Sequence, residues 1–541
     1  MYDYNGEILK DYVESDLENI KNERYLLNDL DAFVNSGNNR KICCLYGLRR
    51  TGKSIMMLHE IKHINDYNKC LLVICDNGES VFDLKKFMSK YEHCDYFFID
   101  EVTKLRDFIN TCSFLADHYA SLGKKVVVTG TDSLGFLIAS NGELFDRVEF
   151  IQTTYISFKE YNHLLSKDIL KYMEYGGTLT DGIALYNRDR GNVYTNSAIS
   201  ENISNSLKKW NQCRNEGYNI LGDLIERNQL PTIINKVIEY NNRTFLSNVI
   251  NKDFTSHDLG SLIDLLTKND FETAHWDKDE LNEKIRICLG IKNELYHYVD
   301  KNIIDAIIEY LVDLDVLYYS KTINNQPLYY SDINSYTFTQ CGLRYAQCDA
   351  LADALIYTDF FNDYSHKQQK MILDKMKSDI RGGLLEDIVY CQIAKDFDKN
   401  IFDDNFVTSY RNKKGAEFDL VIGVDSYNSL IAIEVKLSEI PCDEQVKHLR
   451  NIQFCKDVEN FFGYPIKNKV VLYRGQNQMS PAYNDIVYIN VETFLCNSID
   501  LINYLAENEI KSIEDIEKKI SEISPSEHFL SNTFHSEPPK I

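Results

Sequence analysis

The chain has 541 residues, 44% of them hydrophobic and 26% charged, which is an ordinary composition for a globular protein with several cores. At one to two hundred residues per domain, about three or four units are expected. The 59 Lys and Arg stand against 82 Asp and Glu, and a net charge of −23 repels polyphosphate at long range. This excludes a protein that coats DNA non-specifically, although local basic clusters can still bind it.

No run reaches the roughly 18 apolar residues that cross a bilayer, and the acidic start differs from the basic, then apolar start of a signal peptide. We therefore expect a cytoplasmic protein with no membrane partner. The 14 cysteines include no C-x-x-C pair and sit mostly in apolar runs. This favours reduced, buried thiols over zinc ligands or disulfides.

Residues 1–155 alternate short β-branched and aromatic runs with longer stretches of helical period, which predicts a parallel sheet covered by helices. The predicted strands are residues 41–47, 71–77, 96–101, 125–131 and 148–156. We expect these residues to form one domain.

The middle of the chain is predicted to hold two units. Residues 156–240 are expected to form a helical lid, with a glycine turn at residues 176–177. Residues 241–345 end in an apolar periodic helix followed by short apolar runs and the polar turn NNQP. This pattern fits a winged-helix-like domain, and it equally fits a helical connector with a hairpin.

Residues 346–505 are predicted to form an α/β domain. A helix carrying RGGLLEDIVYCQI precedes the strand candidates EFDLVIGV and LIAIEVKL, and NKVVLYRG suggests another strand. Residues 506–541 are predicted to combine a closing helix with a disordered tail, since the last 17 residues hold three of the eight prolines.

A phosphate-binding loop is predicted between the first strand and the helical stretch after it. Residues 47–54, GLRRTGKS, satisfy G-x-x-x-x-G-K-[ST] in the strand-loop-helix context that the motif needs. Glycines let backbone N–H groups approach the phosphates, and the helix N-terminus presents further N–H groups. Lys53 would neutralise the β- and γ-phosphates, and the Ser54 hydroxyl would bind magnesium. The expected nucleotide-binding residues are Gly47, Arg50, Thr51, Gly52, Lys53, Ser54 and Ile55.

The strand YFFIDE ends in two carboxylates, Asp100 and Glu101. We expect Asp100 to hold magnesium through water, and Glu101 to orient and deprotonate the water that attacks the γ-phosphate. Together with the loop, this pair predicts hydrolysis of ATP with Mg²⁺ rather than nucleotide storage.

Two further features complete the layout expected for an ATPase with an additional strand between the loop and the acidic pair. Residues 131–133, after KVVV, are expected to act as a γ-phosphate sensor, and a helix N-cap is the alternative. Arg147 is a candidate to contact the γ-phosphate in cis or from a neighbouring subunit, although a lone Arg often forms only a surface ion pair.

A second cluster is predicted near the C-terminus. Strand alternation in IAIEVK puts Glu434 and Lys436 on one face, and a turn that pairs Val424 with Ile431 would set Asp419 opposite Lys436 and diagonal to Glu434. Two carboxylates and an ammonium outline a site for Mg²⁺ or Mn²⁺. The alternative is an exposed strand face that carries Glu and Lys for solubility.

Several neighbours would extend this cluster. Glu386, on the preceding helix, would add a third carboxylate, and Gln445 lies on a following helix that could reach the same cleft. The basic residues that would guide a phosphate backbone are Arg411, Lys413 and Lys414.

The sequence resembles the prokaryotic AAA-superfamily ATPases whose C-terminal half is a restriction-endonuclease-like domain of unknown function. The resemblance rests on GLRRTGKS, YFFIDEV, VVVTGTDS, ELFDRVEFIQTTYISFKEYNHLL, YMEYGGTL, GLRYAQ, RGGLLEDIVY, and GAEFDLVI followed by IAIEVK, from about residue 24 to 440. It implies a multidomain α/β fold: a P-loop sheet, a helical and winged-helix-like middle, and a C-terminal PD-(D/E)xK nuclease-like domain.

The resemblance also implies roles for individual residues. Asp419, Glu434 and Lys436 match the nuclease core, with Glu386 as its helical carboxylate, and Arg147 matches the arginine before the Ser-Phe-x-Glu segment. Asp146 replaces the glycine that many relatives have before this arginine.

Two functions are compatible with the sequence. The first is an ATP-driven enzyme that binds or cleaves DNA or RNA through the nuclease-like domain, with a second Mg²⁺ or Mn²⁺ there. The second is a signalling or assembly switch that binds a protein partner or forms a homo-oligomer according to nucleotide state. The acidic net charge favours the switch, and the set of Asp419, Glu434 and Lys436 favours the nuclease.

Overall fold

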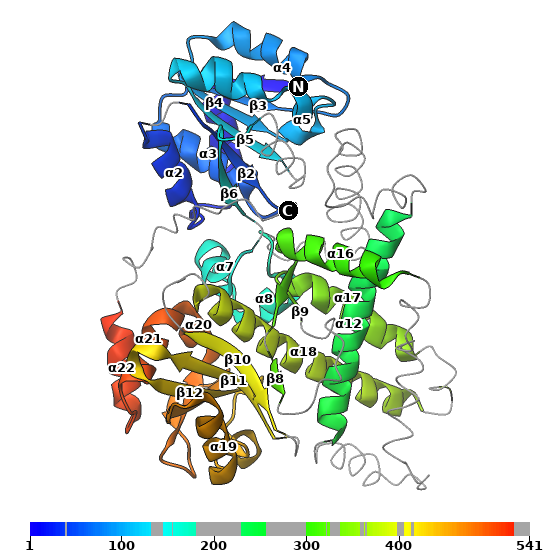
Figure 1. Ribbon diagram of the computed structural model, residues 1–541, viewed down its shortest axis with the longest axis vertical. Coiled ribbons are helices and arrows are strands. Elements are labelled where there is room, and N and C mark those ends of the chain that lie inside the picture. The colour runs from blue at the N-terminus through cyan, green and yellow to red at the C-terminus, as the bar shows by residue number, and fades with distance from the viewer. Residues whose placement is uncertain are drawn as a thin grey trace.

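The computed structural model is a multidomain α/β protein with two large sheets and helices between them (Figure 1). The structure describes residues 1–37, 40–130, 144–153, 155–179, 229–255, 299–320, 322–324, 336–356, 362, 365–397, 405–412 and 416–523. None of the helices formed by these residues combines the length and the hydropathy that a membrane span requires.

The N-terminal sheet has six strands in the order β1-β3-β4-β5-β2-β6. The strands are β1 (Tyr2–Tyr4), β2 (Ile42–Tyr46), β3 (Cys70–Ile74), β4 (Tyr96–Asp100), β5 (Lys125–Gly130) and β6 (Val148–Gln152). All neighbours are parallel except β1, an antiparallel edge strand. The predicted parallel sheet is confirmed, and β5 lies between the loop strand β2 and the acidic strand β4.

Helices cover both faces of this sheet. They are α1 (Gly6–Asp16), α2 (Leu27–Asn35), α3 (Lys53–Ile64), α4 (Val81–Met88) and α5 (Phe108–Thr111). Alternate residues of β2 enter two cores: Cys43 and Leu45 pack with α1, α2 and α3, while Ile42 and Cys44 pack with α4 and the chain after β4. A strand buried on both faces reads as a continuous apolar run, which is why the sequence reveals it so clearly.

The middle of the described chain is helical. It contains α7 (Phe158–Leu165), α8 (Ile169–Tyr175), α12 (Leu230–Thr255), α16 (Lys301–Asp313) and α17 (Cys341–Ile356), with β7 (Leu317–Tyr319) paired antiparallel to β9 (Tyr336–Phe338). Helices α12 and α16 share one core, whereas α7 and α8 pack into the core of the C-terminal sheet.

The C-terminal sheet has seven strands in the order β14-β15-β13-β12-β11-β10-β8. They are β8 (Thr322–Asn324), β10 (Phe406–Arg411), β11 (Glu417–Val424), β12 (Ser429–Val435), β13 (Ile466–Tyr473), β14 (Gln478–Met479) and β15 (Ile486–Asn490). Strands β10, β11 and β12 are antiparallel, and β12, β13 and β15 are parallel. The sheet is therefore mixed.

Helices also cover this sheet on both sides. They are α18 (His366–Phe397), α19 (Ile452–Phe462), α20 (Val491–Cys496), α21 (Ser498–Glu507) and α22 (Ile513–Glu522). Helix α19 packs on one face, and α18, α20 and α21 pack on the other, together with α7 and α8. The C-terminal core thus begins close to residue 156.

Several predicted elements differ from those observed. The apolar run LYYSD after the NNQP turn, residues 328–332, expected to form the second strand of a wing, lies outside the described residues. Strand β7 pairs with residues 336–338. Helices α12 and α17 cross residues 240 and 345, so the boundaries expected there fall inside helices. The closing helix is two helices, α21 and α22, and the last 17 residues, expected to be a tail, are outside the described part.

Candidate functional site

The loop of residues 47–52 joins the carboxyl end of β2 to the first residue of α3. Gly47 and Gly52 have φ of 142° and 88°, a region that side chains rarely adopt. A Cβ on Gly52 would lie 2.7 Å from Leu179 Cδ1 and 2.9 Å from Arg24 Cδ. Backbone conformation and crowding therefore both demand glycine at position 52.

The side chain of Lys53 folds back over this loop. Its buried ammonium donates hydrogen bonds to the carbonyl oxygens of Gly47 at 2.9 Å and Leu48 at 2.7 Å. Burial lowers the pKa of Lys53 to about 8, although the carboxylates of Glu101 and Asp100 oppose this shift. The loop thus holds one cation at its centre, beside two acids.

Asp100 is held by three donors at the end of β4. Ser54 Oγ donates to its Oδ2 at 2.7 Å, the backbone N–H of Glu101 donates to its Oδ1 at 2.9 Å, and the Thr129 hydroxyl donates to the same Oδ1. In the sheet, β5 lies between β2, which leads into the phosphate loop, and β4, which ends in Asp100. The contact between Ser54, on the helix after the loop, and Asp100 therefore spans the position of β5. A hydroxyl and a carboxylate in contact are the oxygen ligands that Mg²⁺ prefers.

Glu101 follows in the left-handed region, with φ of 56°. Its N–H also donates to Thr129 Oγ1 at 3.3 Å. A left-handed non-glycine residue at a strand end costs free energy and often marks a functional position. The turn ends the strand directly after Asp100 and leaves Glu101 partly exposed near Lys53.

Sequence reasoning expected a sensor at residues 131–133, which lie outside the described residues. The structure instead brings Thr129, two residues earlier and fully buried, onto Asp100. Of the other expected nucleotide ligands, Thr51 is buried with its hydroxyl on the Leu48 carbonyl at 2.8 Å, and Arg50 and Ile55 are at least partly exposed.

The structure places Arg147, expected to contact the γ-phosphate in cis or from a neighbouring subunit, away from the phosphate loop of its own chain. Parallel β2 and β6 pair Ile42 with Val148 and Tyr46 with Gln152, so Arg147 lies at the amino end of β6 while the loop leaves the carboxyl end of β2. Its guanidinium pairs with Asp117 at 2.9 Å. A contact with a neighbouring subunit's nucleotide stays a prediction.

Arg24 is an important residue that the sequence reading missed. It is 2% exposed and binds both oxygens of Glu160 at 2.9 Å, from Nε and from one terminal nitrogen. Its other bonds go to carbonyl oxygens of the phosphate loop and of the chain after β6, namely those of Thr51, Thr153 and Tyr155. No local motif marks this arginine, because all its partners are distant in sequence.

The loop is also anchored to the helical middle. Leu48 is 2% exposed and belongs to the core formed by α12 and α16. The N–H of Leu179 donates to the Arg50 carbonyl at 2.9 Å, and Gln152 Nε2 donates to the Asp313 carbonyl at 3.4 Å. The phosphate loop therefore contacts both the middle helices and the chain that leads to the C-terminal core.

The C-terminal cluster forms, but with another register than expected. Strands β11 and β12 pair Val424 with Ser429, not Ile431, which sets Asp419 directly opposite Glu434. The shift of two residues keeps every side chain on the face predicted for it, because the period of a strand is two. Lys436 Nζ contacts Asp419 Oδ2 at 3.0 Å and Glu434 Oε2 at 2.7 Å.

Both carboxylates of this cluster are buried: Asp419 is 8% and Glu434 3% exposed. The backbone N–H of Val435 also donates to Asp419 at 2.8 Å. The alternative reading of an exposed face with solubilising charges is therefore wrong for these two side chains. Their oxygens could bind a divalent cation if the Lys436 ammonium moved aside.

The neighbours expected to extend the cluster do not complete it. Glu386 does not join Asp419 and Glu434 in a set whose oxygens all lie within 4.8 Å of one another. Gln445 Nε2 donates to Ser438 Oγ at 2.6 Å and to the Ile440 carbonyl at 3.1 Å. Arg411 ends β10, and the lysines at 413 and 414 lie outside the described residues.

Comparison with known proteins identifies two parts of the chain. Residues 39–162 match the model of a family described as an AAA domain, and residues 381–494 match a domain of unknown function (DUF4143). No match is found among curated proteins. The S. cerevisiae Hsp104-ADP complex is similar at 12% identity and a TM-score of 0.27, over 70% of this chain and 60% of that chain.

The AAA match covers the phosphate loop and the acidic strand and ends within α7, whereas the second match begins within α18 and ends in α20. The protein therefore carries a P-loop ATPase domain of the AAA type on its N-terminal side and a DUF4143 domain towards its C-terminus.

Proposed function

We propose that the N-terminal domain binds and hydrolyses ATP and transmits its nucleotide state to the C-terminal domain. The observation that carries this proposal is the contact of Ser54 with Asp100 at 2.7 Å, beside the buried Lys53 ammonium. Ser54 and Asp100 would hold Mg²⁺, which neutralises charge that develops on the transferred phosphoryl group. Lys53 supplies the protein's own positive charge at the same place.

Glu101 is the proposed general base. Its position next to the magnesium ligand Asp100, and its electrostatic influence on Lys53, support a carboxylate close to the γ-phosphate. The carboxylate would orient a water and accept its proton. Because only a carboxylate can do both, Glu101→Gln should retain ATP and hydrolyse it slowly.

The route of transmission is supported by two anchors on the loop. Arg24 joins the Thr51 carbonyl to Glu160 on α7, and α7 packs in the C-terminal core. Leu48 packs against α12 and α16. Nucleotide can shift a conformational equilibrium only through contacts that differ between the two states, and these anchors would supply such contacts.

For the C-terminal domain we propose metal-dependent binding or cleavage of a nucleic-acid backbone. The three antiparallel strands β10, β11 and β12, followed by α19 and parallel β13, agree with a PD-(D/E)xK-like core. The proximity of Asp419, Glu434 and Lys436 supports the same assignment. The two acids would bind Mg²⁺ or Mn²⁺, and the lysine would stabilise charge on the attacked phosphate.

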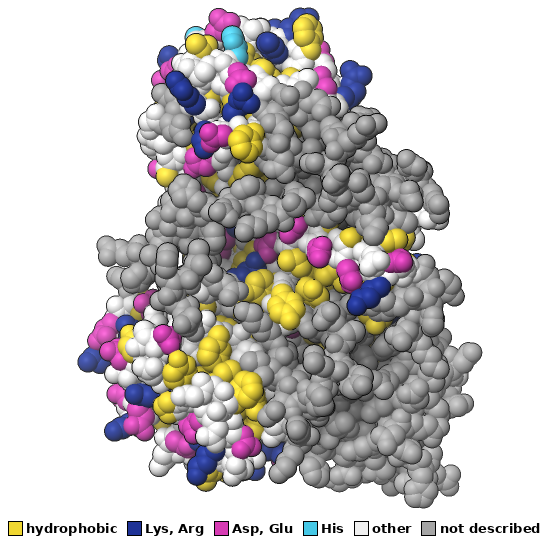
Figure 2. Space-filling model, viewed as in Figure 1, with side chains coloured by type: hydrophobic (Ala, Val, Ile, Leu, Met, Phe, Trp, Pro, Cys, Tyr) yellow, Lys and Arg dark blue, Asp and Glu magenta, His cyan; other side chains and the backbone are white. Residues whose placement is uncertain are grey.

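A second candidate is a nucleotide-dependent switch that binds a protein partner or a second copy of the chain. It is favoured by the net charge of −23 and by Lys436, whose ammonium contacts both carboxylates. On the described part of the face in Figure 2, acidic and basic side chains are interspersed. A surface of mixed sign suits a protein partner at least as well as a phosphate backbone.

One experiment separates these candidates. The purified protein is incubated with ATP, Mg²⁺ or Mn²⁺, and plasmid or single-stranded DNA or RNA, alongside Glu434→Ala and the exposed control Glu444→Ala. Cleavage that Glu434→Ala loses and Glu444→Ala retains supports the nuclease. Absence of cleavage, with an ATPase rate that nucleic acid leaves unchanged, favours the switch. An ATPase rate equal in wild type and Lys53→Ala would refute the proposal for the N-terminal domain.

A further inference from the structure

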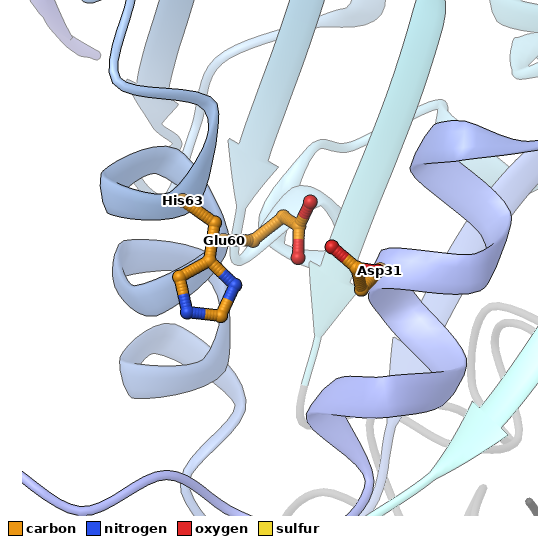
Figure 3. Close-up of side chains that lie close together, drawn as sticks. All are labelled: Asp31, Glu60 and His63. Atoms are coloured by element: carbon orange, nitrogen blue, oxygen red, sulfur yellow. The ribbon is translucent and has the colours of Figure 1, made fainter.

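Three potential metal ligands meet where α2 packs against the phosphate-loop helix α3 (Figure 3). Asp31 comes from α2, and Glu60 and His63 come from the last two turns of α3. One ligand atom of each residue lies within 4.8 Å of the others. The two helices share one apolar core, so the backbone positions of the three residues are set by packing.

Glu60 is an unusual residue in this group. It is 1% exposed, and among the described residues its Oε2 has no hydrogen-bond partner. Burial, followed by the nearby Asp31 carboxylate, raises the pKa of Glu60 to about 7. A buried carboxyl oxygen without a partner costs free energy, and a bound cation would remove that cost.

His63 is oriented as metal-binding histidines commonly are. Its Nε2 contacts the Glu23 carboxylate at 2.8 Å, and Figure 3 shows the other ring nitrogen on the side of Glu60 and Asp31. A carboxylate on one imidazole nitrogen fixes the ring and makes the other nitrogen a better ligand. The site also lies near the C-terminal end of α3, where the helix dipole favours positive charge.

We propose that Asp31, Glu60 and His63 bind a divalent transition-metal ion, with Glu23 positioning His63. An imidazole together with two carboxylates suits Zn²⁺ and its relatives Co²⁺ and Mn²⁺, whereas Mg²⁺ and Ca²⁺ prefer oxygen ligands alone. The ion would tie α2 to α3, the helix whose other end carries Lys53 and Ser54.

The sequence His59-Glu-Ile-Lys-His63 has the H-E-x-x-H spacing of zinc proteases, in which both histidines bind the metal and the glutamate is a base. The structure brings together a different set. His59 is 1% exposed and is not part of the cluster, while Glu60 is. The ion proposed here is therefore a structural one that Glu60 ligates directly.

Equilibrium dialysis against Co²⁺ tests the proposal on the full chain, free of nucleotide and kept reduced without thiols. Wild type is compared with Glu60→Gln, which keeps the shape of the side chain, and with the surface variant His63→Ala. The controls are Glu92→Gln and His93→Ala, which make the same chemical changes at exposed positions outside the cluster. Other cation sites are the same in every protein, so the differences report on this cluster.

We expect Glu60→Gln and His63→Ala each to bind one cobalt equivalent at least about tenfold more weakly than wild type, and to lose the rise in melting temperature that Co²⁺ gives. The controls should match wild type. Equal binding by wild type and both variants would overturn the proposal, as would an absorption spectrum of thiolate ligation alone. Loss with Glu60→Gln but not with His63→Ala would overturn the three-ligand site, since a carboxyl pair would then suffice.

Discussion

Replacing Arg24 by methionine tests how firmly the phosphate loop is connected to the rest of the protein. The change keeps an unbranched chain of similar length but removes every donor. It leaves Glu160, 5% exposed, without its ion-pair partner, and the carbonyl oxygens of Thr51, Thr153 and Tyr155 without the bonds that Arg24 makes.

The magnitude follows from burial. Removing one partner of a buried ion pair costs about 3–5 kcal/mol, because the remaining charge is neither paired nor hydrated. A domain of this size loses about 2–4 °C in Tm per kcal/mol, so we expect Tm to fall by about 6–20 °C. ATP affinity should also fall, since the Thr51 carbonyl and the loop around it lose their anchor.

The measurement is thermal unfolding followed by circular dichroism, with ATP titration of the same samples. Arg106→Met is the matched control, because Arg106 is exposed and its change should move Tm by less than about 2 °C. The double variant Arg24→Met with Glu160→Leu should lose less stability than the sum of the single changes. An Arg24→Met protein that melts within about 2 °C of wild type would show that the pair does not anchor the loop.

Three further predictions concern the nucleotide site. Lys53→Ala should lower kcat/KM for ATP by at least about 100-fold and weaken nucleotide binding, whereas Glu101→Gln should bind ATP normally and lower kcat by about 10²–10⁴. Steady-state assays and binding titrations distinguish the two variants. Turnover by Glu101→Gln comparable to that of wild type would remove the assigned base. Because burial lowers the pKa of Lys53 to about 8, its ammonium is charged below that pH and neutral above it. The kcat/KM for ATP should therefore fall as the pH rises through about 8. A kcat/KM that stays constant up to about pH 9.5 would count against a role for the Lys53 charge. Leu48→Ala should lower the free energy of unfolding by about 2–5 kcal/mol, since Leu48 is buried among α12 and α16. Chemical denaturation measures this change, and a loss below about 0.5 kcal/mol would show that Leu48 does not pack tightly against these helices.

The sequence was most informative where a function depends on contiguous residues. The loop GLRRTGKS and the strand YFFIDE could be read directly, because a tight turn at a helix N-terminus and a strand buried on both faces each have a local pattern. The same holds for the faces of β11 and β12: strand alternation alone places Asp419, Glu434 and Lys436 on one side. The register could not be read, and the expected pairing was wrong by two residues.

Arginines were the hardest residues to assign. Arg147 follows a motif-like stretch, yet it lies at the opposite end of β6 from the phosphate loop. Arg24 lies in no motif and makes five hydrogen bonds to residues 27 to 136 positions away. A local pattern carries no information about such partners.

Asp31 and Glu23 were missed for the same reason, although the HEIKH string could have drawn attention to Glu60 and His63. Hydrophobic period and turn chemistry, which depend on neighbours in the chain, determined the N-terminal sheet, the phosphate loop and the acidic pair. Only the tertiary structure decided which charged groups meet, because burial and pairing of charges depend on how distant elements pack, and packing sets both the desolvation of a group and the identity of its partner.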